Sequence, residues 1–372
     1  MTALTEAGAS VADLGTLLPI TAALVVTNHV DPVAALALAG ALFILAGLYF
    51  RVPIPVQPIK AAAAIAIATR ARPEVIAAAG LVLGAILVVL AVTRAARLLV
   101  RLFPKPLIRG NQLGVGALLV IAAVALVRKP PGSDARALAV AGALLVVLVL
   151  TERARRVPVA LAFVVGGVAW SLLRGASVHL VAHAALPGFS FPGWHAAASA
   201  LTLLVIPQIP LTLGNAVVGT ADLEREYYGA RAARVTPEAL CFSCGAANIA
   251  VGLLGGMPLC HGSSGATAYK RFGARTGAVS VFAGASLLLA GLFFGRAAFD
   301  VFALIPAPVL GALLAYTGVR HALLVTDLKG ASLWIAVAMG TVGALTRNLT
   351  LGMAVGVPAY FLYAASRKVR AR

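Results

Sequence analysis

The sequence predicts an all-α polytopic membrane protein with 14 transmembrane segments, arranged as two inverted repeats of seven. Three observations lead to this fold class. Hydrophobic residues make up 61% of the 372 residues and charged residues only 11%, whereas a soluble domain is about half apolar and a quarter charged. The apolar residues occur in runs separated by short polar stretches. Two of these runs are short and follow clusters of proline or glycine.

The apolar runs follow one another along the whole chain with short connections. At about 20 residues for each crossing, the chain has room for about a dozen full crossings. The short runs are the third and the tenth segments, each a half-helix. The expected segments are residues 14–30, 33–50, 58–68, 75–92, 113–127, 137–150, 157–173, 196–218, 237–254, 263–269, 278–294, 301–319, 331–345 and 349–364.

The positions of the basic residues predict the orientation of the segments. Lys and Arg concentrate in the cytoplasmic loops of membrane proteins. If the N-terminus is cytoplasmic and the segments alternate, most of the 30 Lys and Arg residues fall in cytoplasmic loops. We therefore expect both termini in the cytoplasm and the chain in a bacterial inner membrane. The net charge of +18 then reflects loops that contact anionic lipid headgroups, and a nucleic-acid partner is excluded.

The two short segments occupy equivalent positions in the two halves of the chain. Each follows two full segments, the first after Pro53 and Pro55 and the second after Pro258. Because each half holds an odd number of segments, the two halves have opposite orientations in the membrane. Inverted repeats of this kind are typical of secondary transporters, in which paired short segments indicate the binding site.

The starts of the two short segments form the candidate substrate site. A helix that begins inside the bilayer has unpaired N–H groups and the positive end of its dipole there, so two such starts can hold an anion. Gly262, Ser263 and Ser264 open the second segment; Gln57 and Lys60 open the first. A charge such as that of Lys60 within a membrane is costly and usually functional or paired. The alternative is that Gln57 and Lys60 only cap and anchor a broken helix.

The absence of acidic residues at both starts favours an oxyanion over a cation. Asp13 is expected to cap the first segment, with a role in coupling as the alternative. His261 is a candidate for substrate binding or proton transfer, with a purely structural role as the alternative.

Segment 8 adds polar residues to the candidate site. Gln208, Thr212 and Asn215 recur at positions i, i+4 and i+7, which places them on one side of a helix. They either complete the substrate site or only bond neighbouring helices. Pro207 and Pro210 are expected to loosen this helix and free backbone carbonyls.

Enzymatic and metal functions find no support in the sequence. No P-loop, GxSxG or HExxH pattern is present, so we expect neither an enzyme nor an ATP-driven pump. Cys241 and Cys244 lie inside an apolar segment and Cys260 at a short-segment start. They do not suit a zinc site, and neither a metal nor a cofactor is expected.

Three stretches resemble a known family. Residues 55–61 (PVQPIKA) and 207–215 (PQIPLTLGN) resemble two signature motifs of the molybdate transporter family, which is related to the SulP sulfate permeases. Residues 260–265 (CHGSSG) with 269–275 (YKRFGAR) resemble a third recurrent stretch of that family.

The resemblance implies a SulP/UraA-like fold without a C-terminal STAS domain, and a homodimer. Residues 13–94 and 195–295 would form a core domain that carries the substrate. Residues 98–175 and 299–366 would form a gate domain. Nucleobase transporters of this fold carry glutamates in segment 8 and at the second short helix. This chain has Gln208, Asn215 and Ser263 in those regions, so a nucleobase is not expected.

The resemblance and the candidate site together predict a secondary active transporter of molybdate that works by alternating access. A dianion that enters a cell against 100 mV faces about 4–5 kcal/mol. Uptake therefore needs a coupled cation, and protons are the candidate. The alternatives are a general oxyanion permease for sulfate or tungstate, and an anion channel of the same fold.

Overall fold

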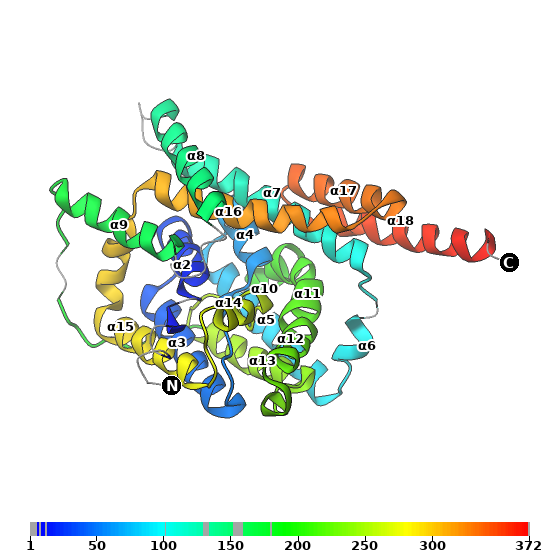
Figure 1. Cartoon of the computed structure of the whole chain (residues 1–372), viewed down its shortest axis with the longest axis horizontal. Helices are drawn as coiled ribbons and strands as arrows, with labels where there is room; N and C mark the ends of the chain where they lie inside the picture. The colour runs from blue at the N-terminus through cyan, green and yellow to red at the C-terminus, as the bar shows by residue number, and fades with distance from the viewer. Residues whose placement is uncertain are drawn as a thin grey trace.

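The computed structural model of this protein describes residues 6, 9–11, 13–100, 102–128, 134–151, 159–178 and 181–370, and most of them are helical (Figure 1). The helices of the first half are α2 (Leu14–Asn28), α3 (Pro32–Phe50), α4 (Lys60–Thr69), α5 (Pro73–Val92), α6 (Ala96–Val100), α7 (Lys105–Val127), α8 (Asp134–Thr151) and α9 (Val159–Leu173).

The second half has the same kind of succession. Its α-helices are α10 (Trp194–Ala200), α11 (Ile206–Leu211), α12 (Thr220–Tyr228), α13 (Pro237–Leu253), α14 (Ser263–Arg271), α15 (Ala278–Ala303), α16 (Ala307–Ala322), α17 (Gly330–Leu345) and α18 (Leu349–Arg370). Two π-helical stretches, Leu201–Val205 and Thr212–Gly219, join α10, α11 and α12. Two 3₁₀ turns, Gly229–Ala232 and Leu323–Asp327, follow α12 and α16.

Local sequence signals fix where several helices begin and end. The Asp31 carboxylate accepts a hydrogen bond from the N–H of Val33 at 2.9 Å, and Pro32 occupies the first helical position of α3. Both features favour a helix start. Arg51 and Arg70 close α3 and α4 in the left-handed conformation, with φ of 60° and 52°. This conformation lets the N–H of each residue bond a carbonyl of the last turn.

The prediction of an integral membrane protein built from helices is confirmed. In the part of the chain that the structure describes, seven helical runs are long and apolar enough to cross a membrane, and six shorter apolar helices accompany them. Both predicted short helices are present as α4 and α14. The start of the predicted seventh segment, at 157 and 158, lies outside the described residues. The count of 14 crossings and the inverted repeat stay predictions.

Two polar stretches differ from the sequence expectation. The polar connection between the expected segments 75–92 and 113–127 contains the short helix α6. The charged connection between the expected segments 196–218 and 237–254 is helical as far as Ala232, so one helical run extends from Trp194 to Ala232. Glu and Arg have good helix propensity, so the helix continues after its apolar part ends. The proline pair in this run has the expected effect, because π-helical stretches flank Pro207 and Pro210.

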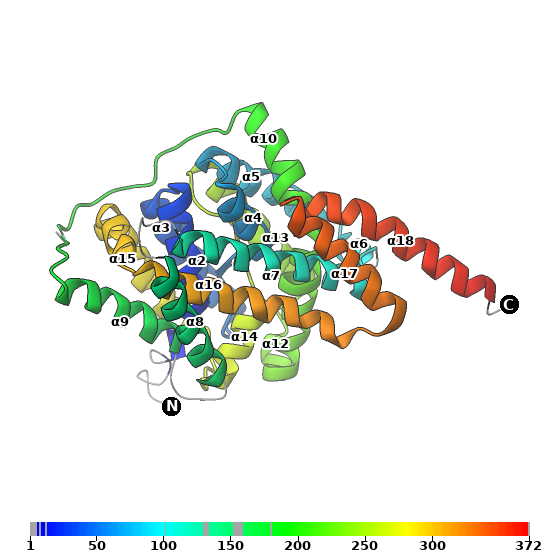
Figure 2. The same ribbon diagram turned by 90° about the horizontal axis from the view of Figure 1, so that it is seen from above.

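The helices pack in two groups. In the first, α3 packs along α15 and α5 along α13; in the second, α7 packs against α16 and α17, and α17 against α18. The second group lies along the upper side of Figure 1. α7 of the second group also contacts the short helix α4, and Figure 2 shows α7 between α4 and α16. The division into a moving core and a gate stays a prediction.

Glycines let the backbones of paired helices touch. A Cβ atom at Gly284 of α15 would lie 2.6 Å from the carbonyl oxygen of Gly40 of α3, and a Cβ atom at Gly40 would lie 2.5 Å from the N atom of Leu288. Small residues at such crossings are typical of helix packing in membranes. The α3–α15 crossing therefore depends on the missing side chains.

We expect Gly284→Ala to lower the free energy of unfolding by about 1–3 kcal/mol, because the added methyl group forces the two backbones apart. Thermal unfolding of the purified protein in detergent measures this change. Gly142→Ala on α8 is the control, since a Cβ atom there meets nothing within 4 Å. Equal melting temperatures for both variants would contradict the close crossing.

Candidate functional site

The two short helices begin at a pair of short strands in the buried interior. Strand β1 (Gln57–Pro58) pairs antiparallel with β2 (Leu259–Cys260), so that Gln57 lies opposite Cys260. The N–H of Ile59 continues the pairing with a 3.0 Å hydrogen bond to the carbonyl of Pro258. α4 and α14 start directly after these strands, at Lys60 and Ser263. The strand pair thus brings the N-termini of the two short helices together, as the sequence predicts.

The start of α4 is capped by a side chain from another helix. Ile59 precedes α4 and has no side chain that could cap it. The Gln208 Oε1 atom of α11 accepts hydrogen bonds from the N–H groups of Ala61 and Ala62, at 3.0 and 3.2 Å. The Gln208 Nε2 atom donates to the hydroxyl of Thr212 at 2.9 Å. Gln208 therefore satisfies two N–H groups that a helix start normally leaves unpaired.

A chain of hydrogen bonds joins four side chains across the two short helices. The Lys60 Nζ atom donates to Gln57 Oε1 and to Ser264 Oγ, both at 2.9 Å. The Ser264 hydroxyl also lies 3.2 Å from Gln57 Oε1. At the other end of its side chain, Gln57 Nε2 donates to the Asp13 carboxylate. Lys60 and Asp13 are thus linked through one amide group, and Gln57 is completely buried.

The carboxylate of Asp13 corrects two expectations. Asp13 makes no side-chain cap on α2; its Oδ2 atom accepts the N–H of Val56 at 3.2 Å, while Oδ1 accepts from Gln57. The residue is 1% exposed. The expectation of a site without a carboxylate is therefore wrong, because Asp13, far away in the sequence, packs against the segment that precedes α4.

Ser263 and Asn215 form a second contact between α14 and the long helical run. The Ser263 hydroxyl donates to the Asn215 Oδ1 atom. Asn215 lies in the π-helical stretch, and Ser263 is the first residue of α14. The two residues are only partly buried. Together with Gln208 and Thr212, they place segment 8 against the starts of both short helices.

Two glycines at the start of α14 leave room for these contacts. A Cβ atom at Gly262 would lie 2.4 Å from Gln57 Oε1. A Cβ atom at Gly265 would lie 2.6 Å from Asp13 Oδ1 and 2.3 Å from the Cβ atom of Pro55. Any larger side chain at either position would push Gln57 away from Asp13 or from Lys60. Gly262 thus contributes to the site because its lack of a side chain leaves room for Gln57.

His261 uses both ring nitrogens in structural contacts. Its Nδ1 atom lies 2.9 Å from the carbonyl of Pro55, and its Nε2 atom lies 2.9 Å from the hydroxyl of Ser243. Its own carbonyl accepts the Thr220 hydroxyl at 2.7 Å. The ring joins the approach to α4 with α13 and does not bond Lys60. These contacts fit the structural alternative better than direct contact with a substrate.

Two buried asparagines support the site and were missed in the sequence. Asn248 of α13 accepts the N–H of Leu259 at 2.8 Å and donates to its carbonyl at 2.7 Å, so it completes strand β2. Asn111 of α7 donates to the carbonyl of Pro207 and so joins α7 to the proline-containing helix α11. Asn248 is a polar residue inside an apolar run, which was the signal available in the sequence, whereas Asn111 precedes the expected segment 113–127 and gave no such signal.

One side of α14 connects the site with the end of that helix. Ser264, Thr267 and Lys270 are exposed, whereas Gly265, Ala266 and Tyr269 on the other side are buried. The Tyr227 hydroxyl lies 3.3 Å from the Thr267 hydroxyl. The exposed polar residues thus lead from Ser264, beside Lys60, to the C-terminal end of α14.

The arrangement suits an anion of high charge density. Lys60 has three protons on Nζ, of which Gln57 and Ser264 accept two. The third proton and the first N–H groups of α14 are donors in a region of low polarity, where charge-assisted hydrogen bonds are strong. Among the described residues, no group of three or more His, Cys, Asp or Glu side chains could hold a metal ion.

Most of the chain matches the model of a known protein family. Residues 5–119 and 200–320 match a family model described as "Molybdate transporter of MFS superfamily". Molybdate transporter 2 of Arabidopsis thaliana is 29% identical over 96% of this chain and 86% of its own length. Molybdate transporter 1 of Chlamydomonas reinhardtii is 28% identical over 85% of this chain and 83% of its own length. The family and these relatives are transporters, not enzymes.

Solved structures with a similar fold are anion transporters. The transmembrane domain of the cyanobacterial bicarbonate transporter BicA has a TM-score of 0.72 at 16% identity, over 94% of this chain and 96% of that domain. SLC26A9 has a TM-score of 0.68 at 15% identity, over 98% of this chain and 65% of its own. At these identities the likeness shows a shared fold, which agrees with the expected SulP-type architecture.

We expect Ser264→Ala to weaken the binding of molybdate at least about ten-fold, because it removes a hydroxyl that positions Lys60 and faces the exposed side of α14. Gln57→Ala should weaken binding as well, since Lys60 and Asp13 lose their common partner. A thermal-shift titration measures both, because a ligand that binds only the folded protein raises its melting temperature.

Ser286→Ala is the matched control for Ser264→Ala, since the exposed Ser286 hydroxyl bonds the carbonyl of Phe282 in its own helix and no other residue that the structure describes. Its molybdate-induced shift should equal that of the wild type. An undiminished shift in both Ser264→Ala and Gln57→Ala would place the anion elsewhere.

We expect Gln208→Ala to lower the free energy of unfolding by about 1–3 kcal/mol, because it leaves the N–H groups of Ala61 and Ala62 without an acceptor. Gln208→Glu keeps an acceptor and should retain most of the stability. It should weaken anion binding, however, because it adds a negative charge at the start of α4. Melting temperatures with and without molybdate separate the two effects; a fully stable Gln208→Ala would refute the capping role.

Proposed function

This chain belongs to the molybdate transporter family, and from that premise we propose that it carries molybdate across a membrane by alternating access, coupled to protons. It is an integral membrane protein with the fold of anion transporters. The observation that carries the proposal is the Lys60 ammonium group between Gln57 and Ser264, where the starts of α4 and α14 meet. Molybdate would bind there through Lys60, Ser264 and the first N–H groups of α14.

The packing of the helices supports two inverted repeats of seven segments. In the proposed repeats, α3 and α13 are the second segments of their halves, and α5 and α15 are the fourth. The second segment of each half packs on the fourth segment of the other half, because α3 packs on α15 and α13 packs on α5. The antiparallel pairing of β1 with β2 also fits a two-fold relation. In this topology both termini are cytoplasmic, and α4 and α14 enter from opposite sides and meet near the middle of the membrane.

Alternating access would follow from movement between the two groups of helices. The core would hold α2–α5 and α10–α15, and the gate α7–α9 and α16–α18, in one protomer of a homodimer. The anion site lies entirely in the core, at the starts of α4 and α14. The exposed polar side of α14 leads from Ser264 toward the cytoplasmic end, so this conformation would release its substrate to the cytoplasm.

Asp13 is the residue that would couple transport to protons. A dianion beside Lys60 would lie close to the Asp13 carboxylate, because Gln57 bonds both residues. Like charges at short distance repel, so a proton on Asp13 would favour anion binding and the anion would favour the proton. Two entering negative charges need about two protons to offset a membrane potential of 100 mV. Asp13 would carry one of them.

Uptake of radiolabelled molybdate into proteoliposomes tests the function. With an alkaline interior we expect accumulation above electrochemical equilibrium, and a ten-fold excess of sulfate should leave most of the uptake intact. Accumulation that stops at equilibrium would identify a channel. Complete competition by sulfate would identify a general oxyanion permease.

Asp13→Asn tests the coupling in the same vesicles. The variant should lose accumulation driven by the pH gradient but keep exchange of external for internal molybdate, because the hydrogen bond from Gln57 can persist without the charge. Asp31→Asn is the matched control, since Asn caps a helix as well as Asp does. Gradient-driven uptake by Asp13→Asn at the wild-type rate would exclude Asp13 as the coupling residue.

A further inference from the structure

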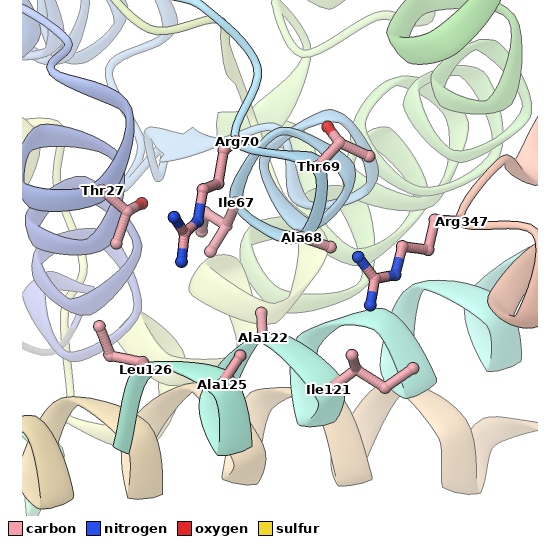
Figure 3. A pocket seen from close by; sticks show the side chains of 10 residues that line it. All are labelled: Thr27, Ile67, Ala68, Thr69, Arg70, Ile121, Ala122, Ala125, Leu126 and Arg347. Carbon is pink, nitrogen blue, oxygen red and sulfur yellow. The ribbon is translucent and has the colours of Figure 1, made fainter. Parts of the chain in front are cut away.

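A cavity of about 360 Å³ lies at the opposite end of α4 from Lys60. The end of α4, with Ile67 to Arg70, forms one wall, and Thr27 of α2 lies beside it. Ile121, Ala122, Ala125 and Leu126 of α7 form the floor, and Arg347 closes the far side (Figure 3). One water takes about 30 Å³ in the liquid, so the space can hold an anion with part of its hydration shell.

The polar lining of this cavity is cationic. Figure 3 shows the guanidinium groups of Arg70 and Arg347 at the two ends of this space, that of Arg70 above Leu126 and turned toward Thr27, and that of Arg347 above Ile121. Neither group makes an ion pair or a side-chain hydrogen bond with any residue that the structure describes. Other arginines do find partners: Arg109 lies 2.6 Å from Asp327, and Arg97 lies 3.1 Å from Glu238.

The neighbours of the two arginines cannot neutralise them. No acidic side chain belongs to the described lining of the cavity. The hydroxyls of Thr27 and Thr69 donate to carbonyls of their own helices, at 2.6 and 2.7 Å. The small alanines of α7 keep the space open between the guanidinium groups. Two arginines that face a common space over apolar walls form a strong site for a small oxyanion, because guanidinium groups bind such anions in a bidentate manner.

We propose that Arg70 and Arg347 together bind one oxyanion in this cavity, at a site separate from Lys60. The ten residues of α4 separate the two sites by about 15 Å. In the proposed topology both arginines lie on the external side. The cavity would therefore capture molybdate before it reaches the site at the start of α4. The capture role rests on the proposed transport of molybdate, whereas the binding site itself does not.

The position of the site also ties it to the relative movement of the two helix groups. Arg70 caps the end of α4, which belongs to the proposed core, and Arg347 follows α17, which belongs to the proposed gate. An anion held by both residues would connect the end of α4 with the end of α17.

Titration of molybdate into the full-length protein at constant ionic strength tests the binding site. We expect two anions per wild-type chain and one per chain of the double variant Arg70→Gln/Arg347→Gln. Arg72→Gln, two residues from Arg70 and paired with Glu74 at 3.7 Å, is the matched control and should keep two. Ser264→Ala should weaken the binding event at Lys60. It should leave unchanged the binding event that the double variant loses.

Each outcome of this titration decides the question. If the double variant binds as many anions as the wild type with the same affinities, or if Arg72→Gln loses the same event, the proposal is wrong. If the wild type binds one anion and the double variant none, the arginine site exists and the site at Lys60 does not. The same titration in nanodiscs with and without phosphatidylglycerol shows whether a free oxyanion or a lipid phosphate occupies the cavity. Equal affinities for molybdate in the two kinds of nanodisc indicate a free anion. A weaker affinity in the presence of the lipid indicates that its phosphate competes for the arginines.

Initial uptake rates in proteoliposomes test the capture role. The double variant should raise the KM for external molybdate at least about three-fold and leave Vmax unchanged, because the later steps keep their residues. Arg72→Gln should change neither value. An unchanged KM in the double variant would exclude capture, even if the titration shows the anion at the arginines.

Discussion

Two helices of this protein begin in its interior, and every helix start leaves N–H groups that need partners. In an apolar environment, water cannot supply those partners, so side chains or a ligand must do so. The start of α4 is satisfied by Gln208, and the strand that precedes α14 is completed by Asn248. The start of α14 keeps donors that face the exposed side of Ser264. Because the start of α4 is capped and the start of α14 is open, the donors that can bind an anion lie on the α14 side of the site.

The same constraint explains the unusual polar residues around the two starts. Lys60 is held by two neutral oxygen atoms and is not paired with a carboxylate, so it retains its ability to attract an anion. Asp13 is close enough to respond to that anion, but Gln57 lies between it and Lys60. A direct ion pair would neutralise the site, whereas a bridging amide keeps both charges available. The glycines at 262 and 265 provide the space that this arrangement needs.

Much of this site could be predicted from the sequence because its signals are local. Proline and glycine clusters marked the starts of α4 and α14, and Gln57, Lys60, Ser263 and Ser264 stood out as polar residues beside them. The role of Asp13 could not be predicted, since its position at the start of an apolar run is equally typical of a helix cap. Only the packing of α2 against the strand pair places it beside Gln57.

The roles of the other predicted site residues also depend on tertiary contacts. The spacing of Gln208, Thr212 and Asn215 indicated a common helix side, but it could not show that Gln208 caps another helix. His261 is adjacent to Gly262 in sequence, yet the turn of the backbone directs its ring to Pro55 and Ser243. Arg70 and Arg347 lie far apart in the chain, and each alone resembles an ordinary loop residue. Their common cavity exists because α7 packs against both α4 and α17 and forms its floor.

A structure determined with bound tungstate would test the central claim most directly, because this heavy analogue of molybdate is easily located. We expect strong density within hydrogen-bond distance of Lys60 Nζ and Ser264 Oγ, between the starts of α4 and α14. Saturating tungstate without density at that position, or with density only at distant residues, would contradict the account.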